Sequence, residues 1–185
     1  MDTTIFTWII YVIWFIIVVY LTVSAIGVKQ ETQGHLLQSV GIMLAIIAAF
    51  LLQRLPMFSF LNVASINPLI DSLGVILCAA VMAFLVWARQ HLGRNWSQTV
   101  SIKKGHELVT SGPYRYVRHP MYAGGIIACI GSAIVVGGAW ILLLVILGLI
   151  FLWRVGAEDR LMARQFPNEY PLYKKRTKAL IPFVW

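Results

Sequence analysis

Apolar runs joined by short linkers dominate the first half of the chain. They extend from Ile5 to Ile26, from Leu36 to Leu55 and from Leu69 to Ala88. A helix of about 20 residues spans roughly 30 Å, which matches the hydrocarbon core of a bilayer. The pattern therefore predicts three membrane-spanning helices within residues 1–90.

A longer apolar stretch, Met121 to Trp153, follows in the second half, and Gly137-Gly138 divides it into two pieces. Each piece alone would cover only about 22–24 Å as a helix, which is less than the hydrocarbon core. Either the two helices continue into polar flanks at their outer ends, or they form a shallow hairpin. Both options return the chain to the side that it left.

The polar segment before this hairpin ends in "GPYRYVRHPMY", residues 112–122. Proline is favoured at the first position of a helix, so Pro120 predicts a helix start with His119 at or near its N-cap. Unpaired backbone N–H groups at such a start can hold an anionic group. Tyr122 lies within the first turn. Taken singly, the tyrosines are also typical of the aromatic belt at a membrane interface.

The segment after the hairpin reads "WRVGAEDRLMARQF", residues 153–166. As a helix, it places Arg154 and Glu158 four residues apart on one face, and Glu158 on the apolar side. An ordinary surface ion pair would give this spacing. A carboxylate on the buried face of a helix that leaves the bilayer usually has a partner or a function, so Glu158 is also a candidate site residue. The pattern does not assign Asp159.

Composition agrees with a membrane protein, because 59% of the 185 residues are hydrophobic and only 12% are charged. The net charge is +8, and thirteen of the fifteen Lys and Arg residues lie in Arg89–Arg118 and Arg154–Lys178. Because these segments flank apolar spans, the positive-inside rule explains them better than a nucleic-acid partner does. We expect both segments in the cytoplasm and the N-terminus outside.

The sequence indicates neither a metal site nor a disulfide. Cys78 and Cys129 fall in the middle of apolar runs, as buried free thiols do. The four histidines show no spacing typical of zinc ligands, so we expect no metal site.

Two stretches together resemble the isoprenylcysteine carboxyl methyltransferase family, which belongs to a wider group of membrane methyltransferases that includes phospholipid methyltransferases. They are "GHELVTSGPYRYVRHPMYAG" and, one helical hairpin later, "RVGAEDRLMARQFPNEYPLYKKRTKALIP". The resemblance covers roughly residues 91–182. The family usually has a Glu-Glu pair where this chain has Glu158-Asp159.

The resemblance implies S-adenosyl-L-methionine (SAM) as the methyl donor and an active site on the cytoplasmic side. By position, Arg154 corresponds to the arginine linked to the methyl-accepting substrate. It and Glu158 are the expected catalytic residues. The residues expected to bind the cofactor are His106, Glu107, Leu108, Val109, Tyr114, His119, Pro120, Met121, Tyr122 and Glu158.

These observations predict an all-α integral membrane protein with about five transmembrane helices, the last two forming a hairpin. The cofactor site is expected between the loop before the hairpin and the C-terminal tail. We expect a single membrane domain, 1–185, with three spans in 1–90 and a methyltransferase core in 91–185.

The expected activity is methyl esterification of the carboxylate of a prenylcysteine-like or other lipophilic substrate. Three alternatives remain open. The chain could be a phospholipid or amine N-methyltransferase, or a membrane protein in which these motifs only pack. It could also be a sterol-type reductase whose basic residues meet the 2′-phosphate of NADPH, the candidates being Lys103, Lys104, Arg115 and Arg118.

Overall fold

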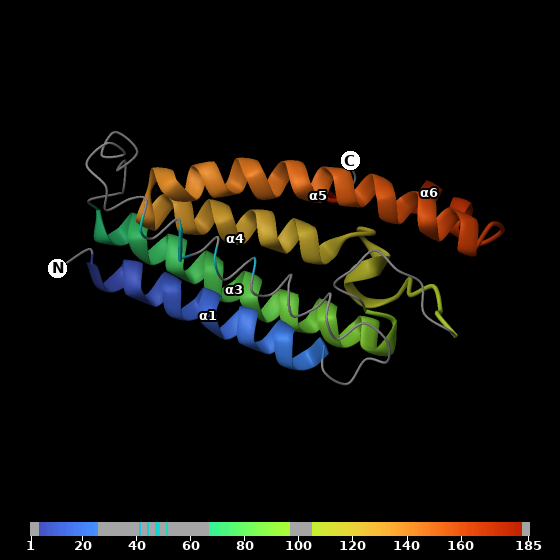
Figure 1. The fold of residues 1–185 in the computed structure, drawn as a ribbon, viewed down its shortest axis with the longest axis horizontal. Coiled ribbons are helices and arrows are strands. Elements are labelled where there is room, and N and C mark those ends of the chain that lie inside the picture. Colours follow the sequence, from blue (N-terminus) through green and yellow to red (C-terminus); the bar gives the residue numbers. More distant parts are fainter. Residues whose placement is uncertain are drawn as a thin grey trace.

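The computed structural model describes residues 4–25, 67–96 and 105–182, together with the single positions 41, 44, 47, 48 and 51. Within this part of the chain the named elements are all helices, and the long ones lie side by side (Figure 1). The second predicted span, Leu36–Leu55, lies almost entirely outside the described residues.

Helices α1 (Thr4–Ala25) and α3 (Pro68–Leu92) form one side of the bundle. They coincide with the first and third apolar runs, which confirms both predictions. The start of α3 is fixed locally, because the side chain of Asn67 accepts a hydrogen bond from the Leu69 amide at 3.0 Å and proline occupies the first position. The helix ends at Gly93, whose φ of 51° suits glycine.

The predicted division of the second half is confirmed, because α4 (Pro120–Val136) and α5 (Gly138–Gln165) meet at Gly137. Gly137 has a φ of 96°, a conformation that glycine adopts at little cost. Helix α5 has 28 residues and is about 42 Å long, so it does continue into a polar flank. Helix α4 begins at Pro120 and is about 25 Å long, so it does not extend before its apolar run.

Close helix packing joins α3 to α4. A Cβ on Gly74 would lie 2.5 Å from a methyl carbon of Val135 and 2.9 Å from the carbonyl oxygen of Gly131. Small residues on both helices therefore set their separation, as is common within membranes. Cys78 and Cys129 are buried free thiols in this interface region.

Helix α1 is attached to this core through two tryptophans. The indole N–H of Trp14 donates to Ser132 Oγ of α4 at 2.8 Å. Its ring lies 5.2 Å, centroid to centroid, from that of Trp140 in α5, which is fully buried. One residue therefore links α1 to both helices of the hairpin.

Short elements gather at one end of the bundle: η2 (Gly93–Asn95), η3 (Gly112–Arg115) and α6 (Tyr170–Arg176) (Figure 1). A parallel bridge pairs Val117 with Lys178, and the Arg118 and His119 amides donate to carbonyl oxygens of residues 178 and 179. The C-terminal segment is thereby held against the start of α4.

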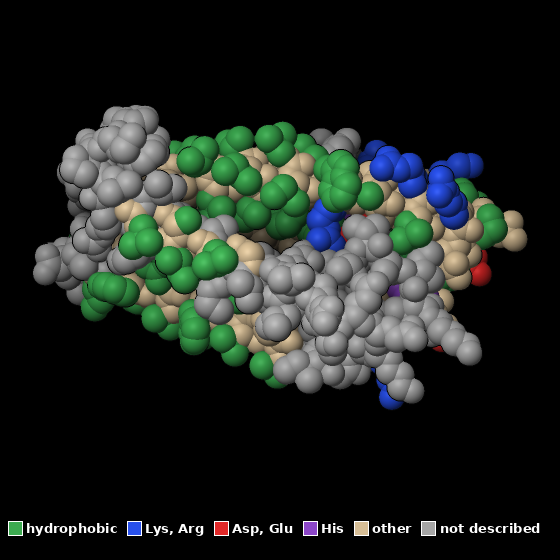
Figure 2. All heavy atoms as spheres, in the orientation of Figure 1, with side chains coloured by type: hydrophobic (Ala, Val, Ile, Leu, Met, Phe, Trp, Pro, Cys, Tyr) green, Lys and Arg blue, Asp and Glu red, His purple; other side chains and the backbone are tan. Residues whose placement is uncertain are grey.

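Three helices of the described residues, α1, α3 and α5, are long and apolar enough to cross a membrane, and α4 is a shorter apolar helix. Apolar side chains lie exposed along the bundle, whereas Lys and Arg gather at the end that carries α6 (Figure 2). This distribution is that of an integral membrane protein with a polar end.

Candidate active site

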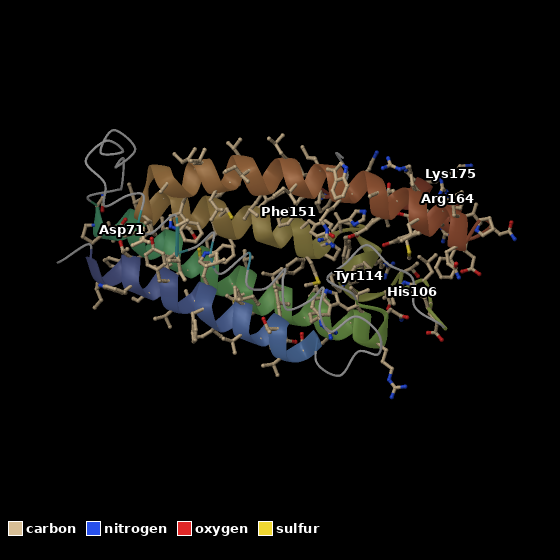
Figure 3. The ribbon with its side chains drawn as sticks, in the orientation of Figure 1. Asp71, His106, Tyr114, Phe151, Arg164 and Lys175 are labelled. Atoms are coloured by element: carbon tan, nitrogen blue, oxygen red, sulfur yellow. The ribbon has the colours of Figure 1, made fainter. Side chains whose placement is uncertain are left out.

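A cavity of about 550 Å³ lies at the polar end of the bundle and continues between the helices. This volume falls within the usual range for small-molecule sites. The structure places every site residue predicted from the sequence on its wall: His106, Glu107, Leu108, Val109, Tyr114, His119, Pro120, Met121, Tyr122, Arg154 and Glu158. Figure 3 shows His106 and Tyr114 at this end and Phe151 further along the bundle.

His119 is the N-cap residue of α4, as predicted, and its side chain is buried. The ring lies between the two acidic residues of α5. Its Nδ1 is 3.3 Å from Glu158 Oε2, and its Nε2 is 3.0 Å from Asp159 Oδ1. The start of α4 is therefore tied to the polar end of α5 through one imidazole.

The protonation of His119 follows from this environment. Burial alone would lower its pKa, but the hydrogen bonds to Asp159 and Glu158 and their negative charges outweigh burial. The pKa of His119 is raised above its ordinary value of 6.5. The two acidic neighbours thus favour the charged imidazolium over the neutral ring.

Tyr122, Arg154 and Glu158 form a second group of contacts. The Tyr122 hydroxyl donates to Glu158 Oε1 and accepts from Arg154 Nε at 2.8 Å. A terminal nitrogen of Arg154 lies 3.5 Å from the same carboxylate oxygen. The Tyr122 ring stacks between His119 and Phe151, with centroid distances of 5.6 and 4.8 Å. The predicted pairing of Arg154 with Glu158 on one helix face is confirmed.

Asp159, which the sequence pattern does not assign, has more partners than its neighbour Glu158. Arg118 donates to both of its oxygens, at 3.3 and 3.2 Å. Lys174 Nζ lies 2.9 Å away, and the Tyr170 hydroxyl donates to Oδ1. With His119 these are four partners, two of which come from α6.

Sequence reasoning missed the tyrosines of α6, although both line the cavity. The Tyr173 hydroxyl donates to the carbonyl oxygen of Tyr114 at 2.6 Å, which fixes α6 to η3. Burial raises the pKa of Tyr170 and Tyr173, so both hydroxyls remain protonated donors at neutral pH. Their spacing of three residues in "YPLY" is the available signal, but it does not identify a partner.

The rest of the cavity wall is apolar and comes from within the bundle. Side chains of α1 and α5 contribute most of it: Trp14, Ile17, Val18, Leu21, Leu143, Ile146, Leu147, Ile150 and Phe151. One space therefore joins a charged end, around Arg154 and Glu158, to a hydrocarbon-like interior. Such a site suits a ligand, or two ligands, with both polar and lipid-like parts.

Among the described residues, no group of three or more His, Cys, Asp or Glu side chains has a metal-binding arrangement. The acidic groups at the site face arginine, lysine, histidine and tyrosine instead.

The fold and site define an integral membrane protein with a helical bundle and a polar cavity that reaches into its apolar interior. The model of the isoprenylcysteine carboxyl methyltransferase (ICMT) family matches residues 73–164, about half of the chain. The chain is similar to this family over that range, as its sequence motifs indicate.

Curated relatives agree. The protein-S-isoprenylcysteine O-methyltransferase of Schizosaccharomyces pombe is 33% identical over 96 residues, which are 50% of this chain and 41% of the relative. That of Saccharomyces cerevisiae is 26% identical over 186 residues, 89% and 73% of the two chains. The nickel-cobalt-cadmium resistance protein NccN of Alcaligenes xylosoxydans xylosoxydans is 32% identical over 94 residues, 49% and 44%.

A solved structure of the eukaryotic intramembrane Ras methyltransferase ICMT has the same fold, with a TM-score of 0.62 and 21% sequence identity. The similarity covers 79% of this chain and 53% of that chain. This chain thus spans about half the length of that protein and less than half of the Schizosaccharomyces pombe relative.

Proposed function

We propose that this protein transfers a methyl group from S-adenosylmethionine to the carboxylate of a prenylcysteine-like or other lipophilic substrate. The observation that carries the proposal is the cavity itself, in which Arg154 and Glu158 adjoin an apolar space inside the bundle. A polar donor and a lipid-anchored acceptor need such a combination. The match to the family model and the names of the relatives support the same reaction class.

The residues of the polar end fit the proposed donor. S-adenosylmethionine would supply the methyl group from its sulfonium. The Glu158 carboxylate is one-quarter exposed, and can face the cationic groups of this ligand. The Tyr114 ring on the wall offers a π face for the adenine or for a cation. The predicted segment 106–109 supplies a further part of the wall.

Arg154 would hold the acceptor. Its guanidinium lies between the Tyr122 hydroxyl and Glu158, at the boundary between the polar and the apolar parts of the cavity. A guanidinium can bind a carboxylate through two parallel hydrogen bonds. A carboxylate is ionised at neutral pH, so the acceptor needs no general base. Catalysis then depends on positioning and on the exclusion of water by the apolar wall.

The proposal includes the location of the site. The basic polar end would face the cytoplasm, which puts the N-terminus outside if the Leu36–Leu55 run also crosses the membrane. The described helices α1, α3, α4 and α5 and the run outside the described residues would then form a single membrane domain, 1–185.

Binding and turnover test the proposal on purified protein in lipid nanodiscs. We expect S-adenosylhomocysteine to bind in calorimetry, and methyl groups from labelled S-adenosylmethionine to appear in farnesylcysteine as an alkali-labile ester. Glu158→Gln should weaken S-adenosylhomocysteine binding at least tenfold, about 1.4 kcal/mol. A nucleotide control, NADPH, should not bind.

Glu169→Gln is the matched control, because Glu169 is exposed and lies outside the cavity wall. It should bind S-adenosylhomocysteine like the unaltered protein. Binding of NADPH in place of S-adenosylhomocysteine would overturn the proposal, and so would equal binding by the two variants. Methylation of an amine lipid but not of farnesylcysteine would overturn the carboxylate acceptor.

A further inference from the structure

The His119 ring lies between two carboxylates. Glu158 faces Nδ1 and Asp159 faces Nε2. An ionised carboxylate can only accept hydrogen bonds, and a neutral imidazole has only one N–H. A neutral ring would therefore turn an unprotonated nitrogen toward one of these two anions. The geometry therefore favours an imidazolium, which donates to Asp159 on one side and forms an ion pair with Glu158 on the other.

We propose that Asp159 is a positioning residue of the site: acting through His119, it holds the Glu158 carboxylate in the orientation that faces the cavity. Asp159 itself is buried behind the imidazole. This inference rests on the proposed function for its consequence in cofactor binding, but the protonation of His119 can be measured without any ligand.

Asp159 is suited to this role because it is fixed on its other sides. Arg118 binds both of its oxygens, and Lys174 and Tyr170 reach it from α6. An anchored anion can hold the imidazole in one orientation at little additional entropic cost. The C-terminal segment thus contributes to the geometry of Glu158 without touching it.

Further groups stand near the imidazole. The Tyr122 ring stacks on it from α4, and the His119 amide donates to Ala179 of the C-terminal segment. Arg154 pairs with Glu158 on the far side of that carboxylate. The charged and titratable groups around His119 are therefore two anions in direct contact, Glu158 and Asp159, and groups bonded to them: Arg118, Tyr122, Arg154, Tyr170 and Lys174.

The charge of His119 depends on pH in a direction that its two acidic neighbours set. The two carboxylates raise the pKa of His119, so its charged form persists above the ordinary pKa of 6.5. Removing the Asp159 charge lowers that pKa. As the pH rises through the lowered value, His119 loses a proton. The single proton of the neutral ring can then lie on Nε2, which leaves Nδ1 without a proton to face Glu158.

The first test needs no substitution of Asp159. Histidine labelled with ¹⁵N reports the protonation of each ring nitrogen by NMR, and the His119 signals are those that persist when His35, His91 and His106 are replaced by glutamine one at a time. At pH 7.5 we expect both His119 nitrogens to be protonated. A neutral His119 at this pH would overturn the proposal.

The second test compares pH profiles of S-adenosylhomocysteine affinity. We expect an almost flat profile for the unaltered protein between pH 6 and pH 8, and a loss of at least tenfold across this interval for Asp159→Asn. His119→Gln should remove most of the effect of Asp159→Asn at pH 8, because residues that act through one another are not additive. A loss of equal size at every pH would show that Asp159 is only structural, which would overturn the proposal.

Lys174→Met is the control for weaker docking of α6. It removes a partner of Asp159 but leaves both His119 contacts, and its side chain is half-exposed. It should not lower the pH at which His119 titrates. If the unaltered protein binds no S-adenosylhomocysteine, the proposed function fails while the NMR test of His119 still decides the positioning role. If Asp159→Asn does not fold, the same NMR measurement decides it.

Discussion

Two different roles are possible for the single residue Arg154, and experiment can distinguish them. It could clamp the acceptor, or it could only hold Tyr122 and Glu158 in place, since it contacts both. Lysine keeps the positive charge but cannot reproduce the planar fork of a guanidinium. The two roles therefore predict different effects of one conservative change.

We expect Arg154→Lys to lose most of its methyl transfer to farnesylcysteine, by at least tenfold, while S-adenosylhomocysteine affinity changes less than threefold. Turnover in nanodiscs and calorimetry measure the two quantities. Arg154→Ala should show the same split. A parallel fall in cofactor affinity would instead mean that Arg154 acts by positioning Glu158, and coupling to Glu158→Gln in a double-mutant cycle would then be strong.

The packing of α3 against α4 depends on glycine at the point where the two helices touch. At Gly74 an added methyl group would meet the backbone of Gly131, which cannot move without displacing the helix. Gly148, by contrast, has nothing within 4 Å of an added Cβ and lies in the middle of α5. The two glycines therefore test packing and helix propensity separately.

Gly74→Ala should destabilise the protein by about 1–3 kcal/mol, because it overpacks a close helix contact. Gly148→Ala should leave stability unchanged or slightly raised, because alanine has the higher helix propensity. Unfolding in mixed micelles, followed by circular dichroism, gives both values. Equal stability of the two variants would show that the α3–α4 contact is looser than the structure indicates.

The orientation of the whole molecule in the bilayer is open to a direct measurement. The basic end carries α6, and the chain enters α3 at the opposite end of the bundle (Figure 1). Cys78 and Cys129 are at most 1% exposed, so they should not react with a bulky impermeant maleimide. Labelling of an introduced cysteine can therefore be measured without a contribution from Cys78 or Cys129.

In sealed, right-side-out vesicles we expect Ser65→Cys to react with the impermeant reagent and Lys175→Cys to react only after the membrane is opened. Lys175 is exposed and lies outside the cavity wall, so its replacement should leave the fold intact. The reverse labelling pattern would place the proposed site outside the cell and would contradict the positive-inside interpretation.

Features that depend on local rules could be predicted from the order of the amino acids. Apolar runs of the right length predicted α1, α3 and the hairpin, and Gly137 and Pro120 predicted where α4 ends and begins. The spacing of Arg154 and Glu158 predicted a shared helix face, because helical geometry places residues four apart side by side. The motifs also selected residues that all line one cavity.

The way in which distant segments meet could be seen only in the folded chain. Asp159 lies next to Glu158 in the chain, yet its partners Arg118 and His119 are 41 and 40 residues away. Helical periodicity fixes the direction of a side chain but not which segment packs against it. For the same reason the sequence did not predict the roles of Tyr170 and Tyr173. Nor did it predict the apolar extent of the cavity, which forms where α1, α5 and the C-terminal segment come together.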